Sequence, residues 1–550
     1  MRFCNIKLLI LAAIVLATSG CGSNDSSSNP GGKSEMDRMA ELLEQESTGE
    51  PAVGNAASVP PAVKPTGERD YEEYMLGKYR DGVTPQNNAA VLFWQAMSPG
   101  ELEPEDYGAI CRELGVQQID SAENTLKNVQ SEPYRQRVLQ WFRANGRPGA
   151  TDKEAFGFIV YVTSRPWTSS TVPPLANWPQ ENQAALDMLI EAAKLPRFYL
   201  PSPSLLNEID EALMERRMLG PQMARRAAND LAIRAMWNLG EGRPDDTWHD
   251  ILAIYRLGRL VSQGYTIVEQ LVGYAIDRYA SDATLAILQH VKLSPDQAKA
   301  IHRDLSSLAE YSAMVDAIDI GERTSLEDIT MRMKLGKKGH WLELLSVNES
   351  VLALARMPAD WNVVIQQSNE FCDRIVAAVR MSPGPARAQA IEALNREISQ
   401  MEAGVKRKLP SIGGMTEAER GELFASMLLA LQLPNVDVAL YAQDRTNTHL
   451  ALSRLAAALA VYRAEHGRYP DSLDALVSEI IDKLPVDCFH QGPFVYRPAA
   501  DGFTLYSFGP NGQDNSGLDA KEPVSANIPA DADDIAIRLP LPKLELPKAK

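Results

Sequence analysis

Apolar residues recur at helical spacing along most of this chain, and the period changes only near its C-terminus. From about residue 70 to residue 450, apolar positions three and four apart predict a series of amphipathic helices. One helix is expected over residues 227–239. After a Gly- and Pro-containing turn, Asp246 is expected to cap the next helix, which carries Gly258 on its apolar face. Because glycine has no side chain, this position predicts a closely packed neighbouring helix.

Capping sequences mark two further helix starts. Thr266 followed by Glu269 has the form of a capping box, and Ser294 with Pro295 places proline in a first turn. The span 231–264 is also compatible with one tetratricopeptide-type hairpin, but no second copy follows at a fixed period. Since such repeats need several units to bury a continuous core, an irregular helical domain is the favoured interpretation and TPR-like hairpins are the alternative.

An aromatic and proline-rich stretch interrupts the helical pattern between residues 165 and 201. It contains Trp167, Trp178 and Tyr199. Aromatic side chains beside prolines provide rigid apolar surface, so a binding groove is one interpretation. The favoured interpretation is a long connection whose aromatic side chains fill the core of the helical domain.

The pattern near the C-terminus predicts a small α+β module over residues 441–538. Apolar positions at helical spacing end at Gly467, and a turn with a short capped helix is expected over residues 468–476. The runs 492–497 and 502–508 then alternate in character and are separated by a turn, which predicts a β-hairpin.

Several motifs of this module occur in one fixed order. They are YRAEHGRYP (462–470), LPVD (484–487), FVY (494–496) and LYSFGPNGQ (505–513). In this order they resemble the globular part of the major pseudopilin of type II secretion, which implies a long helix packed on a small antiparallel sheet. That family assembles through an apolar N-terminal half of the long helix, whereas here a helical domain precedes the module. The resemblance therefore implies a pseudopilin-type head without the part that builds a filament.

The same resemblance implies a structural calcium ion in the loop after the hairpin. Calcium takes about six to eight oxygen ligands, which flexible loops rich in carboxylates and carbonyls supply. The matching ligand candidates are Asn511, Asp514, Asp519, Asp531, Asp533 and Asp534. Asn511 stands where the family usually has aspartate, and residues 521–529 are additional. The alternative is a solvated acidic turn without metal.

The first residues have the three-part layout of a signal peptide: two positive charges, the apolar run 8–17, and small residues directly before Cys21. The apolar run is shorter than the roughly 20 residues of a membrane-spanning helix. The arrangement resembles the leader of bacterial lipoproteins, which implies that Cys21 becomes a diacylated N-terminus, although Thr18 stands where that family favours leucine. The alternative is an ordinary signal peptide cleaved near Ala17 or Ser19.

These patterns divide the chain into five parts and predict a multidomain, mainly α protein that ends in a small α+β module. The parts are a signal peptide (1–20), a low-complexity tether (21–69), a helical domain (70–440), the pseudopilin-like module (441–538) and a Pro- and Lys-rich tail (539–550). Beyond the leader, no stretch is expected to be long and apolar enough to cross a membrane.

The net charge bears on the class of binding partner, and the cysteine content bears on disulfide bonding. The formal net charge of −17 argues against nucleic acid, because binding phosphates requires a clustered cationic face. Cys111, Cys372 and Cys488 are too few and too scattered for a disulfide framework, although one pair among them stays open.

The sequence contains no recognisable catalytic motif. The seven histidines form no zinc-binding pattern, and no nucleophile elbow, phosphate loop or dinucleotide fingerprint is present. Cys488 and His490 are not expected to act together, since near neighbours in a loop rarely point toward one another. Catalytic groups distant in sequence can still meet in a fold, so an enzyme stays open.

The expected function is a non-catalytic, lipid-anchored interaction or scaffold protein of the cell envelope, with unknown envelope proteins as partners. Its expected place is the periplasm or the outer face of a bacterial membrane, held by Cys21. One alternative is an enzyme of unknown class with its site in the helical domain. Another is an accessory component of a secretion or pilus-like apparatus.

Overall fold

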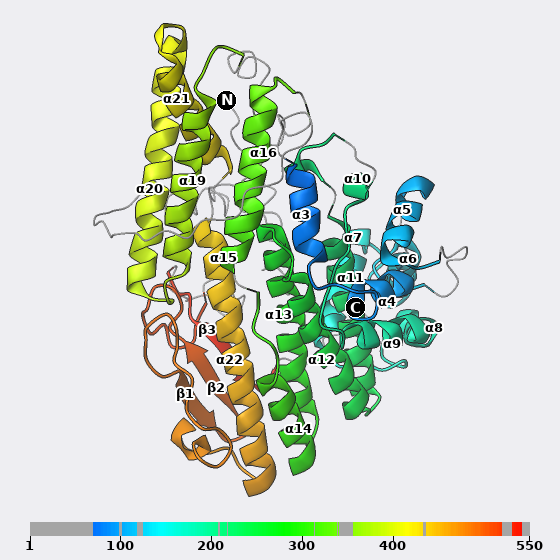
Figure 1. Cartoon of the computed structure of the whole chain (residues 1–550). Helices are drawn as coiled ribbons and strands as arrows, with labels where there is room; N and C mark the ends of the chain where they lie inside the picture. Colours follow the sequence, from blue (N-terminus) through cyan, green and yellow to red (C-terminus); the bar gives the residue numbers. More distant parts are fainter. Residues whose placement is uncertain are drawn as a thin grey trace.

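The computed structural model describes residues 70–97, 102–117, 125–206, 210–216, 218–312, 314–337, 339, 356–432, 436–519 and 531–541. The described part of the chain is mostly helical and ends in one three-stranded antiparallel sheet (Figure 1). This confirms the mainly α class with a small α+β part. The leader, Cys21 with its tether, the additional residues 521–529 and most of the tail lie outside the described residues.

The N-terminal helices pack around the aromatic stretch. Their bounds are α3 (Tyr71–Arg80), α4 (Ala89–Ala96), α5 (Pro104–Leu114), α6 (Glu132–Ala144), α7 (Asp152–Tyr161), α8 (Trp178–Glu181), α9 (Gln183–Ala192) and α10 (Pro203–Leu206). Trp167, Trp178 and Tyr199 are all buried, and the two tryptophans belong to the larger hydrophobic core. The interpretation of this stretch as a connection that fills the core is therefore confirmed.

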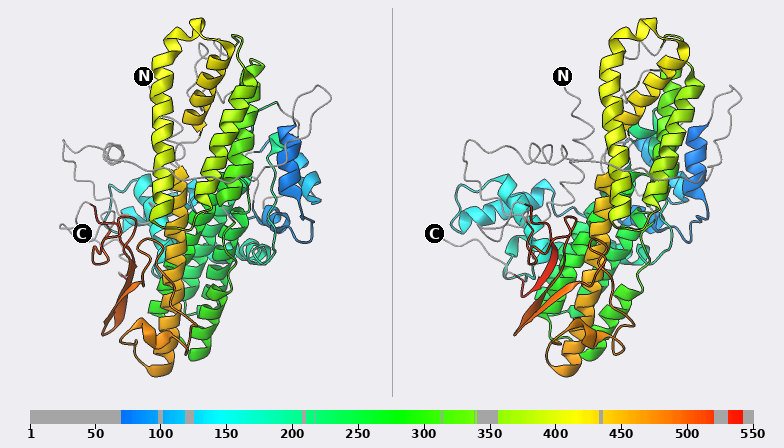
Figure 2. Two further views of the ribbon diagram at one scale, coloured as in Figure 1. Left: turned by 60° about the vertical axis from the view of Figure 1, so that its left-hand side comes forward. Right: turned by 90° about the vertical axis from the view of Figure 1, so that its left-hand side faces the viewer.

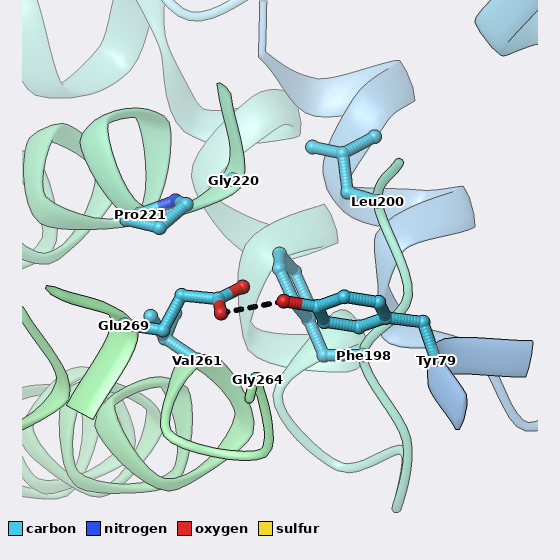
Figure 3. A pocket seen from close by; sticks show the side chains of 8 residues that line it. All are labelled: Tyr79, Phe198, Leu200, Gly220, Pro221, Val261, Gly264 and Glu269. Atoms are coloured by element: carbon cyan, nitrogen blue, oxygen red, sulfur yellow. Dashed lines mark hydrogen bonds between the residues drawn. The ribbon is translucent and has the colours of Figure 1, made fainter. Parts of the chain in front are cut away.

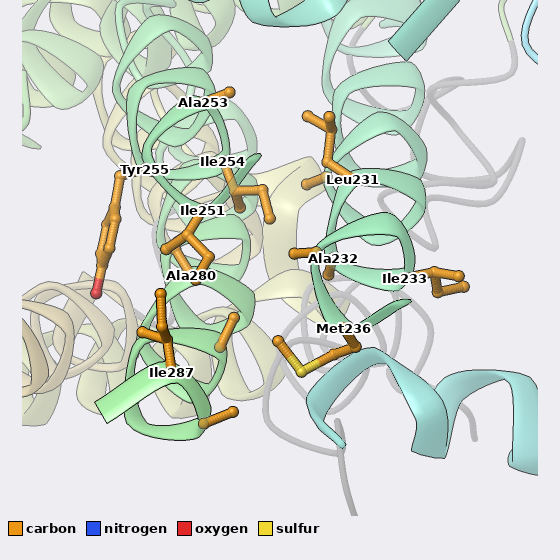
Figure 4. Close-up of a cluster of buried hydrophobic side chains, with 14 of the residues drawn as sticks. Leu231, Ala232, Ile233, Met236, Ile251, Ala253, Ile254, Tyr255, Ala280 and Ile287 are labelled. Atoms are coloured by element: carbon orange, nitrogen blue, oxygen red, sulfur yellow. The ribbon is translucent and has the colours of Figure 1, made fainter. Parts of the chain in front are cut away.

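Helices α11 (Leu219–Gly240), α12 (Pro244–Val261), α13 (Ile267–His290) and α14 (Pro295–Ser306) form the middle of the molecule (Figure 1). Buried side chains from α11, α12 and α13 pack against one another (Figure 4). A Cβ atom on Gly258 would lie 2.8 Å from the carbonyl oxygen of Gly273. The close approach predicted at Gly258 is therefore confirmed, and its partner is α13.

The helix starts bear out most of the predicted caps. The capping box of Thr266 with Glu269 is present, and Ser294 caps α14 with Pro295 in its first turn. The cap predicted at Asp246 is wrong. Pro244 already opens α12 and Asp246 lies within the first turn, because proline is well suited to the first helical position.

A second core lies beyond the middle helices. It is built from α15 (Met314–Asp316), a π-helical turn (Ala317–Glu322), α16 (Arg323–Lys334), α19 (Trp361–Val379), α20 (Pro385–Lys408) and α21 (Glu417–Gln432). Helix α13 contributes to both cores, with Val272 and Ile276 in the first and Leu271 and Tyr274 in the second. The two halves of the helical region therefore meet on α13.

The C-terminal module consists of α22 (Val436–His466), β1 (Val495–Ala499), β2 (Gly502–Ser507) and β3 (Ile535–Leu539), in the sheet order β1-β2-β3. The predicted hairpin is confirmed, with Val495 opposite Tyr506. The short capped helix expected over residues 468–476 is only a 3₁₀ turn at Leu473–Leu476. The predicted boundary at 440/441 falls inside α22, and the module shares the first core with the middle helices.

One stretch within the described residues, Glu417–His466, contains a window long and apolar enough to cross a membrane by length and composition alone. The expectation that no such stretch follows the leader is therefore wrong on that criterion. The window is 64% buried inside the structure, so burial against other helices accounts for its apolar character.

Candidate functional site

The start of helix α13 gathers more ionisable side chains than its capping requires. Glu269 accepts hydrogen bonds from the backbone N–H and the hydroxyl of Thr266, at 3.1 and 2.8 Å from its Oε2. Tyr79 of α3 donates a third to the same oxygen at 2.8 Å (Figure 3). The carboxylate of Glu269 thus joins two segments that are 190 residues apart in the chain.

A small pocket opens beside this carboxylate. It is lined by Tyr79, Phe198, Leu200, Gly220, Pro221, Val261, Gly264 and Glu269 (Figure 3). Its free volume is about 20 Å³, which is enough for one water molecule and not for an organic substrate. The pocket therefore places a carboxyl group and a phenol in contact with each other, beside space for one water molecule.

Burial sets the protonation of this pair. It is the largest cause of the raised pKa of Glu269, and the hydrogen bonds from Thr266 and Tyr79 oppose it. Burial and the neighbouring carboxylate raise the pKa of Tyr79 well above its usual value of 10.0. The phenol therefore keeps its proton at neutral pH and acts as a hydrogen-bond donor.

A second carboxyl group lies at the same helix start. Glu322 ends the π-helical turn and accepts the backbone N–H of Ile267 at 3.3 Å. Burial raises its pKa to about 7. A Cβ on the preceding Gly321 would lie 1.6 Å from the carbonyl oxygen of Tyr265, so this contact requires glycine. Such π-helical turns frequently occur at functional sites.

The chemistry available here is proton exchange near neutral pH. Glu322 has a pKa suited to a general acid or base, and Glu269 lies beside Tyr79. The adjacent Arg323 is committed to Asp319 and Asp373, each at 2.7 Å. The site thus consists of two carboxyl groups, a phenol and room for water.

The structure brings part of the predicted calcium-binding set together. The side-chain amide of Asn511 donates to the backbone oxygen of Asp531 at 2.8 Å and to Oδ1 of Asn515 at 3.1 Å. The backbone N–H of Asn511 donates to Asp533 at 3.1 Å. Two of the six predicted residues, Asp531 and Asp533, therefore direct oxygens at a third, Asn511, and Asn515 joins them.

The other three predicted residues have separate roles. Asp534 is buried and accepts the backbone N–H groups of Asn515 and Gly517, so it shapes the loop. Asp514 accepts from Tyr506 and lies 3.6 Å from Arg497. Asp519 lies 3.4 Å from Arg445 of α22.

The donor types at this loop fit calcium, because amide, carbonyl and carboxylate oxygens are the ligands it prefers. The residues that would hold the ion are Asn511, Asn515, Asp531 and Asp533. An ion bound there would join the segment that follows β2 to the segment that precedes β3, since its ligands come from both.

Cys488 and His490 contact different partners and not each other. Cys488 contacts the hydroxyl of Thr448 at 3.6 Å, whereas His490 bonds to the buried Asp487 at 2.8 Å. Burial raises the pKa of the Cys372 thiol to about 12 and that of Cys488 to about 11. Cys111, Cys372 and Cys488 are all free thiols, so the pair left open by the sequence is not formed among them.

Only one of the two carboxyl groups at the start of α13 was predictable from the sequence. Glu269 was identifiable as a cap, but its contact with Tyr79 depends on the fold. Glu322 had no local signal. A third buried acid, Asp230, lies in α11, and burial raises its pKa to about 7.

Comparison with known proteins identified no relative, since no family model, no curated protein and no solved structure matches this chain. The resemblances of the leader to lipoproteins and of the module to pseudopilins therefore stay predictions.

The raised pKa of Glu322 predicts how stability depends on pH. Its ordinary value is 4.5, so between there and about 7 the folded chain keeps a proton that the unfolded chain has lost. The free energy of unfolding therefore falls through this window. Glu322→Gln, which keeps an acceptor for Ile267, should remove the fall and be more stable than wild type at about pH 8 by about 1–2 kcal/mol, allowing for partial solvent exposure.

Urea unfolding at about pH 5 and about pH 8 measures this difference. Glu105→Gln, at an exposed glutamate in the first turn of α5, is the matched control and should shift stability similarly at both pH values. A Glu322→Gln effect of the same size at both pH values would contradict the assignment.

Proposed function

We propose that this chain is a non-catalytic interaction or scaffold protein of the bacterial cell envelope, held to a membrane by a lipid on Cys21. The leader and the tether support the address. The partners are other envelope proteins, and the working part is the helical region with its C-terminal module. A calcium ion in the loop 511–534 is part of this proposal as a structural element.

The observation that best supports the scaffold role is that buried arginine–carboxylate pairs join different helices. Some of the arginine–carboxylate pairs in the interior join two different helices, whereas Arg332–Asp328 lies within α16. The pairs that join helices are Arg234–Asp250 between α11 and α12, Arg259–Asp277 between α12 and α13, and Arg387–Asp444 between α20 and α22. Each of these side chains is at most 10% exposed. Because such pairs add little net stability, we infer that here they specify which helices pack together.

The packing of α22 disfavours the alternative of a secretion or pilus accessory. That alternative needs the surface of the module that contacts pilins to be exposed. Here one side of α22 packs on the sheet and another packs on α13 and α14 (Figure 2). A partner would therefore have to use the outer face of the sheet or the loops.

The enzyme alternative has one specific observation in its favour, the paired carboxyl groups at the start of α13. Carboxyl groups whose pKa is raised by burial are typical of acid–base sites, and here Glu269 also contacts a phenol. The small free volume of the pocket speaks for a structural role, because a substrate would need the site to open.

The address is tested at Cys21. We expect the chain to fractionate with membranes and its mature N-terminal peptide to carry a diacylglyceryl mass, whereas Cys21→Ser should be exported and released. Cys4→Ser, which changes the other leader cysteine, is the matched control and should stay with membranes. An unmodified N-terminus at Ser19 or Cys21 would contradict the anchor.

The structural calcium ion is tested on the same purified protein. Protein that contains no calcium and whose stability is unchanged by chelation would contradict a calcium site.

The scaffold role is tested by disabling the carboxyl site in the cell. A chain carrying both Tyr79→Phe and Glu322→Gln should complement a deletion strain as well as wild type, because a scaffold does not need proton transfer there. Each substitution removes a proton-bearing group while preserving side-chain shape. Loss of complementation by a variant that is folded and correctly localised would favour the enzyme.

A further inference from the structure

A group of metal-ligating side chains lies at the C-terminal end of α22, apart from both sites described above. Glu465 and His466 are the last residues of the helix, and Glu479 follows the 3₁₀ turn. One ligand atom from each lies within 4.8 Å of the other two. Among the residues that the structure describes, no other set of three histidine, cysteine or carboxylate side chains comes this close together. All three side chains are exposed.

Two of the three ligands are already oriented. The imidazole of His466 packs against the ring of Tyr462, with centroids 4.2 Å apart, and its Nε2 lies 2.7 Å from Oε1 of Glu479. The carboxylate of Glu465 pairs with Lys299 of α14 at 2.5 Å. Supporting contacts of this kind hold ligands in place before a metal binds, which lowers the cost of forming a site.

We propose that Glu465, His466 and Glu479 form a zinc site. One imidazole nitrogen and two carboxylate oxygens suit Zn²⁺, which takes four ligands in protein sites and would keep a water molecule in the remaining position. Imidazole selects zinc and neighbouring transition metals over calcium, which binds oxygen alone. The ion replaces the hydrogen bond between His466 and Glu479 and fastens the end of α22 to the segment that follows the 3₁₀ turn.

Zinc titration of the purified full chain by calorimetry, after removal of metals, tests the proposal. We expect one zinc ion to bind with an affinity that falls by at least about tenfold in His466→Ala, since loss of even a supporting group costs that much. Glu479→Gln is a second variant that keeps the size of the side chain. His249→Ala, at an exposed histidine of α12, is the matched control and should bind like wild type.

Cobalt is a second probe, because its visible absorption reports an imidazole ligand. The absorption of the cobalt-loaded chain should change in His466→Ala and stay unchanged in Asp533→Asn, which alters the loop 511–534. Zinc affinity that is equal in wild type, His466→Ala and Glu479→Gln would overturn the proposal. So would zinc binding that is lost in Asp533→Asn and kept in His466→Ala.

Discussion

The packing of α22 on two of its sides is the constraint on which the rest of the structure depends. Between Leu450 and Val461 nearly every residue of this helix is buried, so apolar side chains face all directions. A helix with this pattern is stable only when it is enclosed. The three-stranded sheet covers one side and helices α13 and α14 cover another, which places the module directly on the helical region (Figure 2).

Polar contacts also join the C-terminal module to both cores of the helical region. Arg387 of α20 pairs with Asp444 of α22, so the second core is also joined to the module. Gln289 of α13 donates to the backbone oxygen of Leu541 at 3.3 Å, just beyond β3. Gln491 donates to the carbonyl oxygen of Pro383 at 2.9 Å, beside the start of α20. The module therefore has a fixed position relative to both cores.

Elements with local signals were predictable from the sequence, and elements defined by long-range contacts were not. The cap at Thr266, the close approach at Gly258 and the hairpin of β1 and β2 each depend on a few neighbouring residues. The π-helical turn ending in Glu322 depends instead on contact between Gly321 and Tyr265, which no local pattern encodes. Aspartate is a common helix cap, so the sequence predicts a cap at Asp246, but helix α12 already begins at Pro244.

The candidate sites divide in the same way. Asn511, Asp531 and Asp533 were identifiable because they gather in one loop region, whereas Asp514 and Asp519 have arginine partners that only the fold reveals. The link between Tyr79 and Glu269 spans 190 residues and could not be inferred from spacing. Sequence thus located the oxygen-rich loop and missed the buried acids at the start of α13.

Native-state hydrogen exchange tests the central claim, that α22 joins the module and the middle helices in one cooperative unit. The most protected amides of α13, α22 and β2 should open with free energies that agree within about 1 kcal/mol, because they share one core. Amides of β2 that open at a free energy several kcal/mol below those of α13 would show a module that unfolds on its own, and would contradict the account.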